Sequence, residues 1–175
     1  MLRGASFLVL IVAFALPAGA SAATSSPASV TRETSLETLV LRQVNEVRAD
    51  HGLAPLSASA PLTRAALGHS RSMITLGFFT HESQNGTPFW QRVKRFYSPR
   101  SSGGWTVGEN LAMFGGSAPN AESIVAAWMA SSGHRANLLR RMFRDAGVAI
   151  VHGSSAGGVF GGESTWVITL DFGNR

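Results

Sequence analysis

The sequence of 175 residues contains no cysteine. This absence excludes a disulfide scaffold, a thiolate-bound zinc, a catalytic thiol and an iron–sulfur cluster. Lysine is nearly absent as well: Lys94 is the only one, arginine makes up the other basic side chains, and the net charge is +5. The length fits one domain, and a domain of this size can bury a core without covalent cross-links.

Local motifs of common enzyme classes are missing too. There is no G-x-S-x-G nucleophile motif and no phosphate-binding P-loop. His81 and Glu82 begin like the H-E-x-x-H zinc motif, but Asn85 stands where the second histidine belongs. A functional site must therefore be assembled from residues that lie apart along the chain.

The one long apolar run lies at the start of the chain. Arg3 precedes an apolar stretch over 5–16, and the sequence A-S-A at 20–22 fits the A-x-A cleavage pattern. These features predict a secretory signal peptide over 1–22, cut near Ala22, and the run is too short to span a bilayer. We therefore expect an exported protein, extracellular or periplasmic, with no membrane span and no nucleic-acid partner.

The rest of the chain divides into a short lead-in and one domain. Residues 23–34 are rich in serine, threonine and alanine, and we expect them to be disordered. Over 35–175, apolar spacing predicts helices and period-two alternation predicts strands. The first predicted helix begins at Thr34 and ends at Gly52, and the second begins at Ser59 and ends at Gly77. Two more predicted helices cover 119–130 and 134–141. An extended stretch covers 105–114, and two strands cover 147–152 and 164–172. Helices first and antiparallel strands last are typical of an α+β fold.

Three polar residues stand in settings that need an explanation. His69 lies on the apolar face of the second predicted helix, where the simplest interpretation is a core histidine bonded to the backbone. His134 follows a break between two helical segments, and Glu109 lies between glycine and apolar residues, where a buried carboxylate must pair. Together they suggest a concave site with two imidazoles and one or two carboxylates. Such a set can bind a divalent metal or act as a general acid and base.

Several short stretches carry a family resemblance. In chain order they are V-N-E-V-R at 44–48, G-L-A-P-L at 52–56, H-S-R-S-M at 69–73, F-F-T-H at 78–81, G-E-N-L-A at 108–112, W-M-A-S-S-G-H-R-A-N-L-L at 128–139 and G-V-A at 147–149. In order and spacing, the chain from about residue 36 to 173 resembles the CAP superfamily of cysteine-rich secretory, antigen 5 and pathogenesis-related proteins, also called the SCP domain. The lack of cysteine resembles the minimal bacterial type.

This resemblance implies an α-β-α sandwich, in which helices flank a central antiparallel sheet. It also implies a cavity lined by two histidines and two acids. His69 and His134 match the two histidines, and Glu109 matches one acid. For the fourth position, His81 is our first choice and Glu82 the second. In such a cavity His69 and His134 can hold a divalent metal such as zinc, with His81, Glu82 and Glu109 lining it.

Members of this family are linked to lipid binding, metal binding and proteolysis, so the resemblance does not select one chemistry. We expect a monomeric binding domain, not an enzyme, that holds a divalent metal or a small or lipid ligand at the cell envelope or outside the cell. The alternative is a hydrolase, protease-like, that uses Glu109 or a histidine as base and Ser70 or Ser72 as nucleophile.

Two clusters of basic residues suggest a further partner. One contains Arg92, Lys94, Arg95 and Arg100, and the other contains Arg135, Arg140, Arg141 and Arg144. Clusters of one charge sign attract anionic envelope polymers or lipid headgroups. A solvated surface without a partner is the alternative interpretation.

Overall fold

The computed structural model describes residues 28–100 and 104–175, so the predicted signal peptide and its cleavage site lie outside the described residues. The elements are β1 (Val30–Arg32), α1 (Thr34–Asp50), β2 (Ser57–Ala58), α2 (Ala60–Leu76), α3 (Phe89–Lys94), β3 (Thr106–Gly115), α4 (Ala121–Ala130), α5 (Ser132–Leu138), β4 (Asp145–Ala156), the 3-10 turn η1 (Gly158–Phe160) and β5 (Glu163–Asn174).

Strands β4 and β5 form the centre of one sheet. The order is β1-β4-β5-β3 with antiparallel neighbours, and the short β2 runs parallel to β4. The glycine-rich stretch between β4 and β5 makes the predicted hairpin, in which Gly158, Gly161 and Gly162 have positive φ angles that favour glycine. Strand β3 is left at one edge of the sheet, and the candidate site lies along it.

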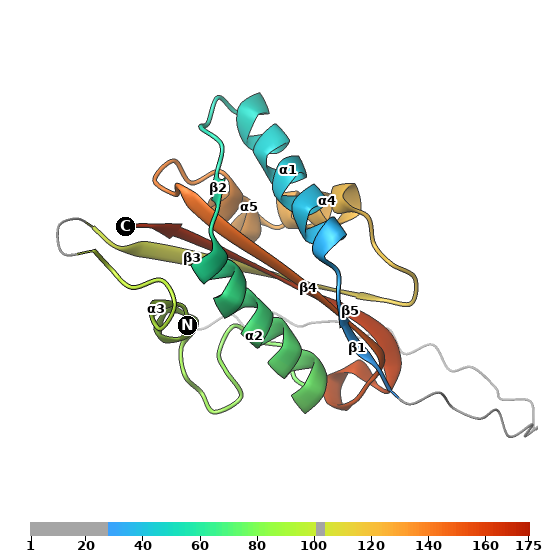
Figure 1. Cartoon of the computed structure of the whole chain (residues 1–175). Helices are drawn as coiled ribbons and strands as arrows, with labels where there is room; N and C mark the ends of the chain where they lie inside the picture. Colours follow the sequence, from blue (N-terminus) through green and yellow to red (C-terminus); the bar gives the residue numbers. More distant parts are fainter. Residues whose placement is uncertain (1–27, 101–103) are drawn as a thin grey trace, which may run out of the picture.

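Helices cover both faces of the sheet. In Figure 1, α1, α4 and α5 lie on one side and α2 and α3 on the other. The predicted α+β fold with an α-β-α sandwich is therefore confirmed. Because both faces are covered, the alternating side chains of β4 and β5 are buried on each side of the sheet.

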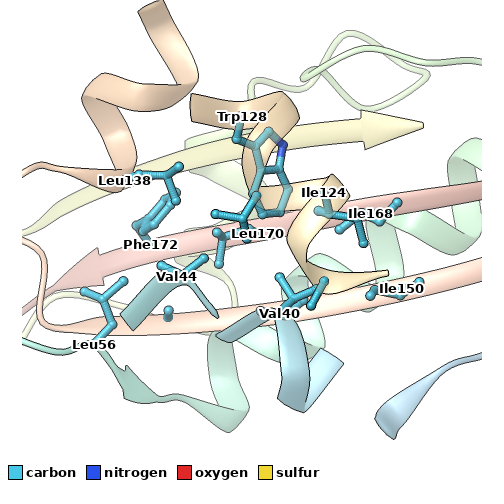
Figure 2. Close-up of a cluster of buried hydrophobic side chains, with 14 of the residues drawn as sticks. Val40, Val44, Leu56, Ile124, Trp128, Leu138, Ile150, Ile168, Leu170 and Phe172 are labelled. Atoms are coloured by element: carbon cyan, nitrogen blue, oxygen red, sulfur yellow. The ribbon is translucent and has the colours of Figure 1, made fainter. Parts of the chain in front are cut away.

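The larger core lies between the sheet and the layer of α1, α4 and α5. Figure 2 shows Val40 and Val44 of α1 and Trp128 of α4 packed over Ile150 of β4 and Leu170 of β5. The indole Nε1 of Trp128 donates a hydrogen bond to the carbonyl oxygen of Leu111 at 3.0 Å, so this ring also ties α4 to the edge strand β3.

Two expectations from the sequence need correction. Within the lead-in that we expected to be disordered, Val30–Arg32 form β1, because their backbone pairs with β4. The last predicted helix, over 134–141, begins earlier and already ends at Leu138. The buried guanidinium of Arg48 accounts for its end, since Nη1 donates to the carbonyl oxygens of Leu138 and Arg140 and holds that segment in a turn.

The close approach of α2 to β4 depends on Gly147. A Cβ atom at this position would overlap the backbone of Leu62 and Thr63. We expect Gly147→Ala to lower the free energy of unfolding by about 3 kcal/mol, as overpacking in a tight core does. Urea unfolding followed by circular dichroism measures this change.

Gly133→Ala is the matched control, because a Cβ atom on Gly133 meets nothing within 4 Å and alanine favours a helix. Its stability should be unchanged or higher. If Gly147→Ala were as stable as the control, the close contact between α2 and β4 would not be essential.

Candidate functional site

A cleft of about 430 Å³ opens at the edge strand β3. Its wall is made by the loop after α2, by the start of α3, by β3, by the end of α5 and by the turn that follows α5. The lining residues are His81, Glu82, Phe89, Val107, Gly108, Glu109, Asn137 and Arg140. Polar groups from segments far apart in the sequence therefore meet in one hollow, as sites assembled by tertiary folding do.

A hydrogen bond between His81 and Glu109 lies at the base of this cleft. Nδ1 of His81 donates to Oε1 of Glu109 at 2.8 Å. The carboxylate can only accept, so the ring proton is on Nδ1 and Nε2 remains for other contacts. The hydrogen bond and the charge of Glu109 raise the pKa of His81, against the opposing effect of burial. The Glu109 side chain is almost fully buried, whereas that of His81 is 45% exposed.

Arg92 completes this chain of polar contacts. One of its nitrogens, Nη2, donates to Oε2 of Glu109, and Nη1 donates to the backbone oxygen of His81 at 3.0 Å. We placed Arg92 in a surface cluster from the sequence, and this is wrong, because the residue is buried. The signal that could have found it is Glu109 itself, since a buried carboxylate needs a cation.

Asp171 is a second buried carboxyl behind Glu109. The strand register places it directly opposite Glu109 on one side and Gly147 on the other. It is fully buried, and neither carboxyl oxygen has a hydrogen-bond partner among the described residues. Burial raises the pKa of Asp171 well above its usual value, and the charge of Glu109 raises it further, whereas Arg92 opposes the change. Sequence reasoning missed this residue.

His69 does not line the cleft. It is 1% exposed on α2, and its Nε2 donates to the carbonyl oxygen of Thr80 at 2.9 Å. Burial lowers the pKa of His69 to about 4, with a further contribution from Arg92, so the ring is neutral at neutral pH. It borders a separate hollow of about 300 Å³ that Ser72 and Arg92 also line. Its clearest role is to hold the loop that carries His81.

His134 is brought near the site by two asparagines. Nδ2 of Asn110 donates to the backbone oxygen of His134 at 3.0 Å, and Nδ2 of Asn137 donates to Oδ1 of Asn110 at 3.0 Å and to the backbone oxygen of Glu109 at 3.2 Å. These bonds dock α5 against β3. Burial lowers the pKa of the His134 imidazole, and the charge of His81 lowers it further.

Glu82 and the two candidate nucleophiles lie in different environments. Glu82 is exposed, and its Oε2 accepts a 2.6 Å hydrogen bond from the Thr80 hydroxyl, which lowers the pKa of the carboxyl. Ser70 is buried against the sheet, where its hydroxyl bonds Thr169 at 2.8 Å. It is therefore not available as a nucleophile in the cleft, and Ser72 lines the other hollow.

The polar atoms of the site bond to one another and to the backbone in this arrangement. Among the residues that the structure describes, no three histidine, aspartate or glutamate side chains are grouped to bind one. Both oxygens of Glu109 are engaged by His81 and Arg92, and Nε2 of His69 is engaged by Thr80. Metal binding by His69 and His134 therefore stays a prediction.

Comparison with known proteins decides the family. Residues 41–172 match the model described as the cysteine-rich secretory protein family, CAP. The chain belongs to the CAP family. The Bacillus subtilis protein YkwD is 36% identical over 133 residues, which are 75% of this chain and 48% of YkwD. The membrane protein YlbC of the same organism is 30% identical over 118 residues, which are 67% of this chain and 32% of YlbC. This CAP chain thus spans less than half the length of either relative.

Solved structures share the fold of this CAP domain. An extracellular protein containing an SCP domain from Bacillus anthracis superposes with a TM-score of 0.63 and 24% identity, over 82% of this chain and 41% of that protein. An outer surface protein of Borrelia burgdorferi gives a TM-score of 0.65 and 17% identity, over 84% and 99% of the two chains. Within residues 28–100 and 104–175, the CAP domain has no helix that is long and apolar enough to cross a membrane.

The raised pKa of Asp171 predicts how stability depends on pH. A carboxyl whose pKa is higher in the folded than in the unfolded state stabilises the fold at acid pH, and this contribution is lost as pH rises through the folded pKa. Asp171→Asn cannot ionise, so it should gain stability relative to the wild type above pH 4, by at most about 1.4 kcal/mol per pH unit.

Urea unfolding between about pH 4 and pH 7 measures this difference. Glu163→Gln, at an exposed carboxyl on the same strand β5, is the matched control and should show no such trend. A stability difference between Asp171→Asn and the wild type that is the same at both pH values would contradict a protonated Asp171.

Proposed function

We propose that this CAP domain is an exported binding module whose cleft along β3 takes a small amphipathic ligand with an anionic head. The observation that carries this proposal is the chain of contacts from Arg92 through Glu109 to His81 at the base of the cleft. It fixes the ring of His81 while one edge of that ring stays accessible. A preorganised polar group in a partly apolar cleft is typical of a small-molecule site.

The charges of the cleft favour an anionic head. The charge of Glu109 is already matched by Arg92. His81, with its raised pKa, and Arg140 then add positive charge to the wall, opposed by Glu82 at the exposed rim. An imidazolium and a guanidinium bind carboxylate or phosphate by charge-assisted hydrogen bonds.

The apolar part of the ligand would lie against Phe89 and Val107, which line the same cleft. Burial of aliphatic groups against such side chains supplies affinity, while the polar groups select the head. Members of the family that the motifs resemble are linked to lipid binding, which agrees with a ligand of this kind.

An extracellular or envelope location is part of this proposal. It rests on the signal peptide predicted over 1–22 and on the extracellular and outer-surface SCP-fold proteins that share the architecture. A binding module in that location would capture its ligand outside the cytoplasm.

A hydrolase is the second candidate, because one observation favours it. Glu109 orients His81 as a carboxylate orients the histidine base of many hydrolases. The buried Ser70 cannot act as its nucleophile, so such a reaction would need an attacking water. Casein cleavage that is lost in both His81→Ala and Glu109→Gln would favour this candidate over binding alone.

Decanoate is a suitable probe for the binding proposal, because it joins a carboxylate to an apolar chain. In calorimetric titrations of the mature chain, His81→Ala and Arg140→Ala should each bind decanoate about tenfold more weakly, the effect of one charge-assisted hydrogen bond. Affinity should also fall as pH rises through the raised pKa of His81, because the ligand needs the protonated ring.

Arg135→Ala is the matched control, since Arg135 is exposed on α5 and does not line the cleft. Its decanoate affinity should equal that of the wild type. Equal affinity of the wild type, His81→Ala and Arg140→Ala would overturn the proposed site.

Zinc separates this proposal from the metal site predicted by resemblance. If the cleft takes an amphipathic ligand and holds no metal, zinc titrated into the wild type and into a His69→Ala, His134→Ala double variant should give the same heat. Heat that is present in the wild type and lost in the double variant would assign the site to a divalent metal.

A further inference from the structure

The outward face of α3 carries aromatic and basic side chains that the fold does not use. Trp90 is 42% exposed and Phe96, just after the helix, is 41% exposed. Lys94 and Arg95 are exposed as well. Trp90 and Lys94 are one helical turn apart, as are Gln91 and Arg95, and these four line a shallow hollow of about 410 Å³. We call Trp90, Lys94, Arg95 and Phe96 the α3 surface.

The α3 surface is held on a rigid base. On the inner side of the same segment, Val93 and Tyr97 are fully buried, and Arg92 is paired with Glu109. The hydroxyl of Tyr97 donates to Asp145 at 2.5 Å, which anchors the segment to β4. The packing of α3 is therefore complete without the exposed rings, which are accessible to a partner.

The charged side chains of this segment of the sequence have one sign. No aspartate or glutamate occurs between Ser83 and Gly108. The buried Arg92 is neutralised by Glu109, but Lys94, Arg95 and Arg100 form no ion pair with any residue in the described part of the chain. The partner that complements this surface is therefore anionic.

We propose that the α3 surface docks on an anionic lipid bilayer. Tryptophan and phenylalanine rings settle at the boundary between headgroups and acyl chains, and basic side chains beside them pair with anionic headgroups. An anionic polymer would engage the basic side chains but would leave the two exposed rings without a role. The combination on one short segment with a buried inner side favours the bilayer.

This docking is separate from the ligand cleft. The α3 surface uses the outer side of α3, whereas only Phe89, from the start of the helix, lines the cleft. Docking by this face would hold the cleft close to a membrane. The decanoate affinity of variants on the α3 surface should therefore equal that of the wild type, which keeps the two proposals independent.

Co-sedimentation with vesicles tests the proposal. The mature chain should sediment with vesicles of equal parts phosphatidylglycerol and phosphatidylcholine and stay in solution with pure phosphatidylcholine. Each basic side chain near an anionic surface raises partitioning about fivefold, so Lys94→Gln with Arg95→Gln should weaken it about 25-fold. Trp90→Ser should weaken it about tenfold, because a buried aromatic contact is lost.

The matched control is the double variant Arg135→Gln with Arg141→Gln, which removes the same charge from exposed positions outside the α3 surface. It should partition like the wild type, and circular dichroism verifies that all variants are folded. An equal loss in this control, or no effect of Trp90→Ser, would overturn the proposal. Binding of the wild type to polyglycerol phosphate but not to the anionic vesicles would overturn it in favour of a polymer.

Discussion

The cleft depends on the neutralisation of one buried carboxylate. Glu109 lies on the edge strand β3 with its side chain almost fully removed from water, where an unpaired charge would cost several kcal/mol. Arg92 supplies the opposite charge from α3, and His81 supplies a hydrogen bond from the preceding loop. Because Arg92 also binds the backbone of His81, this one ion pair fixes both the loop and the helix against the sheet.

Three residues in register across the sheet determine the electrostatics behind the cleft. Gly147, Asp171 and Glu109 lie side by side on three neighbouring strands. Gly147 has no side chain, so α2 can approach β4 closely and cover this face. Asp171 is fully buried on this face, and its pKa is raised above that of an exposed aspartate. One close packing contact thus leads to a buried acid whose pKa is raised.

Polar side chains tie distant segments of this fold together, a role that disulfides have in many secreted domains. The buried Arg48 donates to the carbonyl oxygens of Ala54, Leu138 and Arg140, and so connects α1 to the turn that presents Arg140 to the cleft. Asn110 and Asn137 connect β3 to α5 in the same way. These charge-assisted and amide hydrogen bonds hold the wall of the cleft in a family member that has no cysteine.

Local patterns in the sequence predicted the long helices and the final hairpin, and the family resemblance pointed to His81 and Glu109 as candidate site residues. Asp171 and Arg92 could not be found in this way. Alternation along β5 marks Leu170 and Phe172 as the buried face, which leaves Asp171 on the side that faces water in a one-sided sheet. Tertiary packing buries Asp171 instead, because α2 covers that second face of the sheet. Arg92 is buried because it pairs with Glu109, a buried carboxylate that needs a cation.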